Sequence, residues 1–234
     1  MSRTSKIIQA VLLIAIVAAG IRLYLYFRDR HEAVVAPAAK PQEEALDADA
    51  YVSPRKLHPQ DLKGARELTK QPVWVRAGYQ IAYYPFNGHT EFRRLAGKLG
   101  PIEELRIIDV VVNRPPEGEK QVMAVFEKDN KSYAFPIGYV DGENYSIFSD
   151  DILYVQDPHD LYKHWPSSVW QSIGDHQVKP GMNELQASFA VGVGMPEGTG
   201  MSNPRVVNYP NDGHPLRVTF DNGKATEVVP GATS

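Results

Sequence analysis

The chain opens on its longest apolar run, residues 7–27, which read IIQAVLLIAIVAAGIRLYLYF and contain one charged residue, Arg22. A helix of this length rises roughly 30 Å, which is close to the thickness of a bilayer's hydrocarbon core. Tyr24, Tyr26 and Phe27 suit the headgroup boundary, where aromatic rings concentrate. The pattern predicts a transmembrane helix at 7–27, preceded by a short basic amino terminus at 1–6.

A cleaved signal peptide is the alternative for the same run. Its apolar part would be residues 7–16, followed by a cleavage site at the small residues Ala18-Ala19-Gly20. Apolar residues continue through Leu23 and Leu25, however, and this favours an uncleaved signal anchor. Basic residues flank the run on both sides, so charge alone determines its orientation only weakly. The amino-terminal tail of six residues is short and is easily retained in the cytoplasm. We therefore expect a single-pass membrane protein with the bulk of the chain outside the cytoplasm.

The pattern changes after the anchor. Residues 28–52 are rich in Ala, Pro and acidic side chains, lack apolar periodicity and are expected to form a linker. A short helix should follow, with Pro59 in its first turn. Beyond it, β-branched and aromatic residues predict strands, and Asp129-Asn130 marks a hairpin tip. The expected strands are 73–75, 79–84, 105–112, 121–127, 132–137, 145–148 and 152–155. They predict a small antiparallel β-rich domain at 53–156, and an SH3-like barrel fits this length.

Helical spacing begins at Asp157, a favourable N-cap that is followed by Pro158 in the first helical position. Pro166 interrupts the pattern, because proline in a helix interior removes a hydrogen bond. Ser167 or Ser168 can cap the helical turn that follows. These residues predict the first of two helices in the carboxyl-terminal part of the chain.

The second helix is expected at 184–191, with Asn183 as its N-cap and Gly192 at its end. The glycine-rich residues 192–200 should form a flexible connection. Three strands are then predicted, and Asn222-Gly223 between the last two is the strongest two-residue hairpin signal in the chain. These strands are 205–209, 216–220 and 225–229. Residues 157–234 should therefore form a two-helix domain with a three-stranded antiparallel sheet, and the fold class of the soluble part is α+β.

Charge and cysteine content narrow the classes of function. The formal net charge is −3, and beyond residue 32 the chain carries 20 Lys or Arg against 26 Asp or Glu, with no basic run. Nucleic acid is not expected as a partner, because phosphate binding requires clustered basic side chains. The chain contains no cysteine. This excludes disulfides, thiol nucleophiles, Cys-based metal sites and lipid attachment at a cysteine.

The carboxyl-terminal part contains a spaced set of residues that resembles a known family. Trp170 and Ile173 precede Val178-x-x-Gly181-Met182-Asn183; Gly192, Pro196, VVNY at 206–209 and LRVTFDNGK at 216–224 follow. This pattern resembles the SmpA/OmlA family of small envelope proteins. The resemblance implies two helices packed on a three-stranded antiparallel sheet, an accessory role in assembling outer-membrane β-barrels, and kinship in fold with β-lactamase inhibitory proteins, which bind and do not catalyse.

The chain also departs from the SmpA/OmlA pattern. It lacks the lipid-bearing cysteine of the family, carries an apparent inner-membrane anchor and adds a β-rich domain. Pro196 also follows Gly192 at a longer spacing than in the family. These departures bear on the function more than on the fold, because a shared fold does not fix a function.

One polar cluster invites a metal-binding hypothesis. Asp157, His159, Asp160 and His164 lie close in the sequence, and on a helix Asp160 and His164 would share a face. The alternative, which we favour, is that the two aspartates stabilise the positive end of a helix and His164 its negative end. No metal ligand is assigned on this evidence.

Two further sets of side chains have a functional and a structural interpretation. Asp141, Glu143, Asp150 and Asp151 could form a calcium loop or an acid–base pair, but they lack the alternating spacing of a calcium-binding loop and are more typical of solvated loops. Residues 192–200 lack the ending of a phosphate-binding loop. Four aromatic residues lie close together in the sequence: Trp74, Tyr79, Tyr83 and Tyr84. They are interpreted mainly as core or interdomain packing, and alternatively as a patch for a protein or peptidoglycan partner.

These observations lead to three hypotheses about function. The first is a non-enzymatic binding or scaffolding protein of the bacterial cell envelope, tethered to the inner membrane by a single-pass helix, with the bulk of the chain in the periplasm and bound to an envelope protein. The second is a periplasmic inhibitor or ligand-sensing module. The third is a metal-dependent hydrolase that uses the cluster at 157–164. We expect the first, and assign no catalytic, cofactor-binding or metal-binding residue and no cofactor.

Overall fold

The computed structural model describes residues 48–198 and 202–232. Within these ranges the protein is α+β, with short helices and antiparallel sheets, as the sequence predicts. No helix in this part of the chain is long and apolar enough to cross a membrane. The predicted anchor at 7–27 and most of the predicted linker lie outside the described residues. Residues Tyr51–Ser234 belong to one compact unit.

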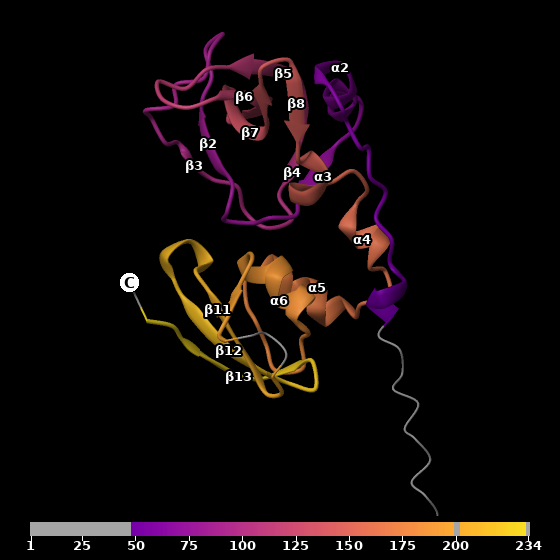
Figure 1. The fold of residues 1–234 in the computed structure, drawn as a ribbon. Coiled ribbons are helices and arrows are strands. Elements are labelled where there is room, and N and C mark those ends of the chain that lie inside the picture. Colours follow the sequence, from indigo (N-terminus) through magenta and orange to yellow (C-terminus); the bar gives the residue numbers. More distant parts are fainter. Residues whose placement is uncertain (1–47, 199–201, 233–234) are drawn as a thin grey trace, which may run out of the picture. The chain divides into compact units, whose positions relative to one another are not determined.

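Two antiparallel sheets make up the first part of this unit (Figure 1). The larger sheet has the order β3-β2-β7-β6-β5, with β8 beside β7; in the smaller sheet β1 lies between β4 and β9. The strands are β1 Val73–Val75, β2 Ala82–Pro85, β3 Gly97–Lys98, β4 Glu104–Leu105, β5 Ile107–Asn113, β6 Lys120–Lys128, β7 Lys131–Asp141, β8 Asn144–Ile147 and β9 Leu153–Tyr154. The helices are η1 Ala48–Tyr51, α2 Leu62–Ala65, η2 Arg66–Lys70 and α3 Ser149–Ile152, where η denotes a 3₁₀ helix.

The β6–β7 hairpin confirms the predicted tip at Asp129-Asn130. Both residues have positive φ angles, 52° and 59°, as a two-residue turn between twisted strands requires. The two strands pair from Lys128↔Lys131 to Lys120↔Val140. This ladder is the spine of the larger sheet, because β5 and β2 pair with its outer sides.

Two local predictions in this part are wrong. Pro59 is not in the first turn of a helix: α2 begins at Leu62, since the side chain of Asp61 accepts the N–H of Gly64 at 2.7 Å and acts as the N-cap. The strand expected at 79–84 starts later, at Ala82, because Tyr79 has a φ of 61° and breaks the extended backbone.

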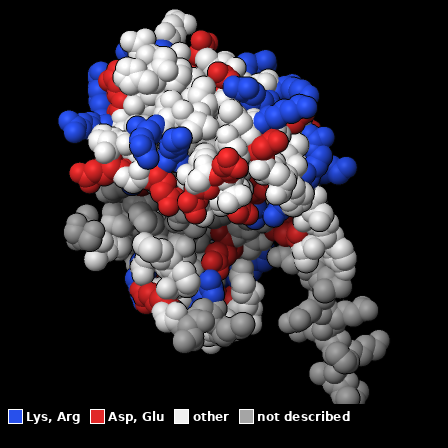
Figure 2. All heavy atoms as spheres, turned by 45° about the horizontal axis from the view of Figure 1, so that its top comes forward, with Lys and Arg blue, Asp and Glu red and all other residues white. Residues whose placement is uncertain are grey.

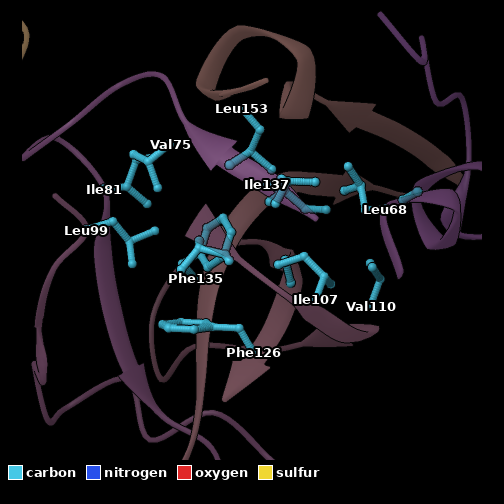
Figure 3. Packing of buried hydrophobic residues seen from close by; sticks show 14 of the residues in the cluster. Leu68, Val75, Ile81, Leu99, Ile107, Val110, Phe126, Phe135, Ile137 and Leu153 are labelled. Carbon is cyan, nitrogen blue, oxygen red and sulfur yellow. The ribbon is translucent and has the colours of Figure 1, made fainter. Parts of the chain in front are cut away.

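The hydrophobic core of the first part lies between the two sheets (Figure 3). Leu99 and Ile107 approach the ring of Phe135 from opposite sides, and Phe126 lies below that ring in the same view. The rings of Phe126 and Phe135 meet edge to face, with centroids 5.7 Å apart. Alternate residues of β6 point into this core, which is why a strand so rich in apolar residues forms here.

Helices and a four-stranded antiparallel sheet form the second part (Figure 1). The sheet order is β10-β11-β12-β13, so β13 is an edge strand. The elements are α4 Pro158–Leu161, α5 Ser167–Gly174, α6 Glu184–Val191, β10 Met195–Pro196, β11 Arg205–Tyr209, η3 Asn211–Gly213, β12 Leu216–Asp221 and β13 Lys224–Pro230. A second core, which includes Phe189 of α6, Val207 of β11 and Phe220 of β12, joins the helices to one face of the sheet.

Capping and turn signals are confirmed in the second part. Asp157 caps α4 with its side chain, which accepts the N–H of His159. Asn183 caps α6 through a capping box with Gln186, and the helix ends at Val191 as predicted. Asn222 has a φ of 48°, the conformation expected for the turn between β12 and β13. These signals are local, and tertiary packing does not override them here.

Two other expectations for the second part are wrong. Neither Ser167 nor Ser168 is the N-cap of α5; Pro166 holds that position and provides no side-chain hydrogen bond. The sheet has four strands and not three, because Met195 and Pro196 pair with β11 within the stretch expected to be a flexible connection. Part of that stretch, residues 199–201, lies outside the described residues.

Candidate functional site

The polar cluster at 157–164 does not have the geometry that a metal site on one helix requires. Helix α4 ends at Leu161, so Asp160 and His164 do not share a helical face, and that expectation is wrong. The ring of His159 contacts Asp157 Oδ1 at 2.9 Å and stacks on Trp170 with centroids 4.1 Å apart. In residues 48–198 and 202–232, no group of three or more His, Asp or Glu side chains is close enough to hold a metal ion.

The acidic residues considered in the sequence serve different parts of the structure. The carboxylate of Asp150 accepts hydrogen bonds from the backbone N–H groups of Leu57 and His58, at 3.0 and 2.7 Å. These bonds hold the segment before α2 against α3. Asp141 pairs with Asn144 across the β7–β8 turn. The carboxylate of Asp150 therefore has a structural role, and Asp141 takes part in the β7–β8 hairpin through its backbone.

The aromatic residues near the start of the β-rich part are mainly packing residues. The ring of Tyr83 lies 5.6 Å from that of Phe126, edge to face, against the first core. Trp74 packs against the second core, although it lies on β1, so this side chain links the two parts. Tyr84 packs on Phe92 with ring centroids 5.7 Å apart. The packing interpretation thus describes these three residues.

A hollow beside α6 is lined by residues of both the first and the second part, and we call it the α6 cleft. Its volume is about 750 Å³, within the range of small-molecule and peptide sites. Helix α6 provides one wall and the segment after β1 another. Apolar side chains line most of it; they include Ile152, Tyr154, Leu185, Phe189 and Val193. Such a surface removes apolar atoms of a bound molecule from water, which is the main source of affinity in small sites.

Opposite charges stand at the rim of the α6 cleft. The guanidinium of Arg76 lies 5.5 Å from the centre of the Tyr154 ring, a cation–π geometry. Glu184 at the start of α6 forms an ion pair with Arg205 of β11 at 2.9 Å. Asp151 of α3 also lines the cleft. Burial raises the pKa of the Tyr154 phenol, and the nearby Arg76 opposes this shift.

Tyr209 lines the α6 cleft, and its hydroxyl group lacks a hydrogen-bond partner within the described residues. The residue is 1% exposed. Burial raises the pKa of the phenol, the nearby carboxylate of Glu184 raises it further, and Arg205 lowers it. A buried hydroxyl without a hydrogen-bond partner lowers the stability of the fold, so the Tyr209 hydroxyl is a candidate contact for a ligand or a buried water.

A close backbone contact fixes the wall of the α6 cleft. The N–H of Val193 donates to the carbonyl of Gly78 at 3.3 Å. Gly192 has a φ of 83°, and a Cβ atom there would lie 2.6 Å from the same carbonyl oxygen. Only glycine fits both the backbone conformation and the space. The sequence identified Gly192 as the end of a helix, but not this long-range contact.

The sequence did not identify the cleft itself. Arg76, Ile152 and Tyr209 come from widely separated segments and carry no common motif. Models of known protein families, curated proteins and solved structures were compared with this chain, and none matches it. The SmpA/OmlA resemblance therefore stays a prediction.

Proposed function

We propose that this chain is a membrane-anchored, non-enzymatic binding protein of the bacterial cell envelope, and that the α6 cleft holds an extended segment of a partner protein. The observation that carries the proposal is the combination of an apolar floor with opposite charges at the rim. An apolar side chain of the partner would fill the floor beside Phe189. Polar groups flanking it would meet Arg76 and Glu184, which fixes the orientation of the segment.

The predicted anchor and the predicted SmpA/OmlA resemblance support an envelope role. A helix at 7–27 would keep the cleft close to the membrane, where envelope proteins are assembled. The order helix–helix–sheet in the second part is the order expected for that family. On this proposal, the two helices and β11–β13 correspond to the family fold, β10 is an addition, and the β-rich part is an SH3-like barrel.

Ser188 provides a direct test, because it lies on α6 and lines the cleft. A photo-reactive amino acid at position 188 of the full chain should crosslink to an envelope protein in intact cells. The same group at Gln171, an exposed position of α5, should not capture that protein. The variant Ser188→Arg, which fills the cleft, should abolish co-purification of the partner, while Gln171→Arg should not change it.

Equal capture from positions 188 and 171, or unchanged co-purification with Ser188→Arg, would refute the assignment of the cleft. Alkaline phosphatase fused after Ser234, with fractionation of the native protein, tests the location separately. An active fusion with membrane retention is expected. An inactive fusion would place the soluble part in the cytoplasm and remove the envelope role.

One observation favours the ligand-sensing alternative. The buried hydroxyl of Tyr209 has no partner among the described residues, and a small molecule with a hydrogen-bonding group could satisfy it. A soluble ligand that binds the chain without its anchor, and loses affinity in Tyr209→Phe, would select this function over the scaffolding role.

A further inference from the structure

Folding gathers three arginines around one hollow in the β-rich part. Arg93 and Arg94 lie in the loop between β2 and β3, and Arg114 directly follows β5. The hollow has a volume of about 340 Å³, and His89 and Glu91 also line it. The sequence shows no basic run here, because the third arginine comes from a segment about 20 residues further along the chain.

A pair of hydrogen bonds brings these segments together. The backbone N–H and the hydroxyl of Thr90 both donate to Asn113 Oδ1, at 2.8 and 2.7 Å. Thr90 is 5% exposed, so this contact is shielded from water. Because Arg114 is the next residue after Asn113, the same contact holds Arg114 beside the loop that carries Arg93 and Arg94.

The β2–β3 loop is further fixed to the sheet beneath it. Phe92 covers a small apolar cluster of Met123, Val125 and Ala134 on the outer face of the β6–β7 ladder. The N–H of Glu91 donates to the carbonyl of Pro85 at 3.0 Å. A loop held in this way presents its charges without a large entropic cost on binding.

The charge balance at the hollow is positive. Arg94 approaches Glu91 at 3.7 Å, and in the part of the chain that the structure describes neither Arg93 nor Arg114 has an ion-pair partner. Glu119 lines an adjoining hollow with Arg114 but makes no ion pair with it. Figure 2 shows Lys and Arg in separate groups with acidic residues between them on the face that it presents, so local clusters determine where an anion can bind. Guanidinium groups suit phosphate because their N–H donors match its oxygens.

Leu95 determines which phosphate source fits best. It directly follows Arg94, and it is 59% exposed. A free anion makes no favourable contact with an exposed leucine, whereas a bilayer has an apolar boundary beneath its phosphates that the leucine side chain can enter. We propose that residues 87–96, together with Arg114, dock on an anionic lipid surface, with the guanidinium groups on the headgroup phosphates and Leu95 in the boundary below. This inference does not depend on the α6 cleft.

The absence of cysteine makes a clean test possible. The full chain carrying Ala96→Cys, labelled with an environment-sensitive fluorophore, is reconstituted in phosphatidylcholine vesicles with or without phosphatidylglycerol. We expect a blue shift of emission and quenching by a lipid-borne quencher only when phosphatidylglycerol is present. High salt should reverse both changes, because surface charges are screened. A label at Tyr139→Cys, an exposed position of β7, should not respond.

Substitutions separate the roles of charge and apolar contact. Arg93→Gln and Arg114→Gln should each lower the equilibrium constant for docking about fivefold. Leu95→Ser should reduce the depth reported by the quencher. Lys98→Gln, an exposed charge of β3 outside the hollow, is the matched control and should have a smaller effect.

Three outcomes would overturn the proposal. One is no response with phosphatidylglycerol, and another is an equal response in phosphatidylcholine alone. The third is a full spectral response to inorganic phosphate in detergent without a bilayer, which would assign the hollow to a soluble anion. Unchanged circular dichroism of each variant excludes loss of folding as the cause of a missing response.

Discussion

The contact between Gly192 and Gly78 predicts a large effect for a very small substitution. Gly192→Ala places a Cβ atom 2.6 Å from the carbonyl oxygen of Gly78 and 2.9 Å from the ring of Tyr79. Residue 192 has φ 83° and ψ −176°, a region that essentially only glycine occupies. Backbone strain of this kind costs roughly 1–3 kcal/mol. Overpacking adds about 1–3 kcal/mol, so we expect a loss of about 3 kcal/mol or more.

Urea unfolding followed by tryptophan fluorescence measures this loss in the full chain. All three tryptophans of the protein, Trp74, Trp165 and Trp170, belong to or pack against the second core, so the signal reports the part of the fold that Gly192 joins. A loss of this size is a large fraction of the roughly 5–15 kcal/mol that stabilises a typical domain. The transition midpoint should therefore fall clearly.

Gly88→Ala is the matched control. Gly88 also has a positive φ, 73°, but a Cβ atom there would have no neighbour within 4 Å. Its substitution should cost only the backbone part, about 1–2 kcal/mol. If Gly192→Ala proves no more destabilising than Gly88→Ala, the close approach of Gly192 to Gly78 is not present in solution and the reasoning fails.

Three further predictions concern the hydroxyl groups of tyrosines and the side-chain amide of Asn113. Tyr209→Phe should leave the free energy of unfolding unchanged or raise it by about 1 kcal/mol, because it removes an unsatisfied buried hydroxyl; a clear loss of stability in thermal unfolding would show that the hydroxyl has a partner. Burial raises the pKa values of Tyr79, Tyr154 and Tyr209 in the folded state, so the tyrosines of the unfolded chain ionise first as the pH rises. The free energy of unfolding should therefore be retained below about pH 10 and fall above it. Thermal unfolding across this pH range measures the fall, and a constant midpoint would contradict the prediction. Asn113→Ala should destabilise the protein by about 2 kcal/mol because the two donors of Thr90 lose the one acceptor that they share, whereas Asn113→Asp keeps an acceptor and should cost less; equal losses would contradict the geometry.

Local signals allowed the helix and turn boundaries of the second part to be predicted. Asn183 and Asp157 each provide a side-chain oxygen that satisfies a free N–H at a helix start, and this requirement depends only on neighbouring residues. Asn222-Gly223 adopts the turn conformation that few other pairs accept. Such preferences are strong enough to be read without knowledge of the rest of the fold.

Two predictions failed for different reasons, one local and one that depends on a contact across the chain. Asp160 and His164 have helical spacing, but Pro166 lies too close for the helix to continue, and α4 ends at Leu161. β10 has only two paired residues, and its position is set by β11 and not by its own composition. A strand of this length leaves no periodic pattern in the sequence.

Both candidate sites lay beyond sequence analysis for the same reason. The α6 cleft combines Arg76 with Glu184, and the basic hollow combines Arg93 with Arg114. No spacing rule connects the members of either pair, because loops and turns of unrelated length separate them. Composition showed that the chain beyond residue 32 is acidic on average, and this average conceals a local basic cluster.

In the part of the chain that the structure describes, β13 is paired on one side only, and this unpaired edge has a consequence for contacts between copies of the protein. An unpaired strand edge can recruit the same edge of another copy and grow into a polymer, a risk that rises with local crowding. β13 carries Lys224 and Glu227, both exposed, and ends at Pro230, which has no N–H to offer. The charges and the missing N–H donor therefore protect this edge against pairing with the same edge of another copy.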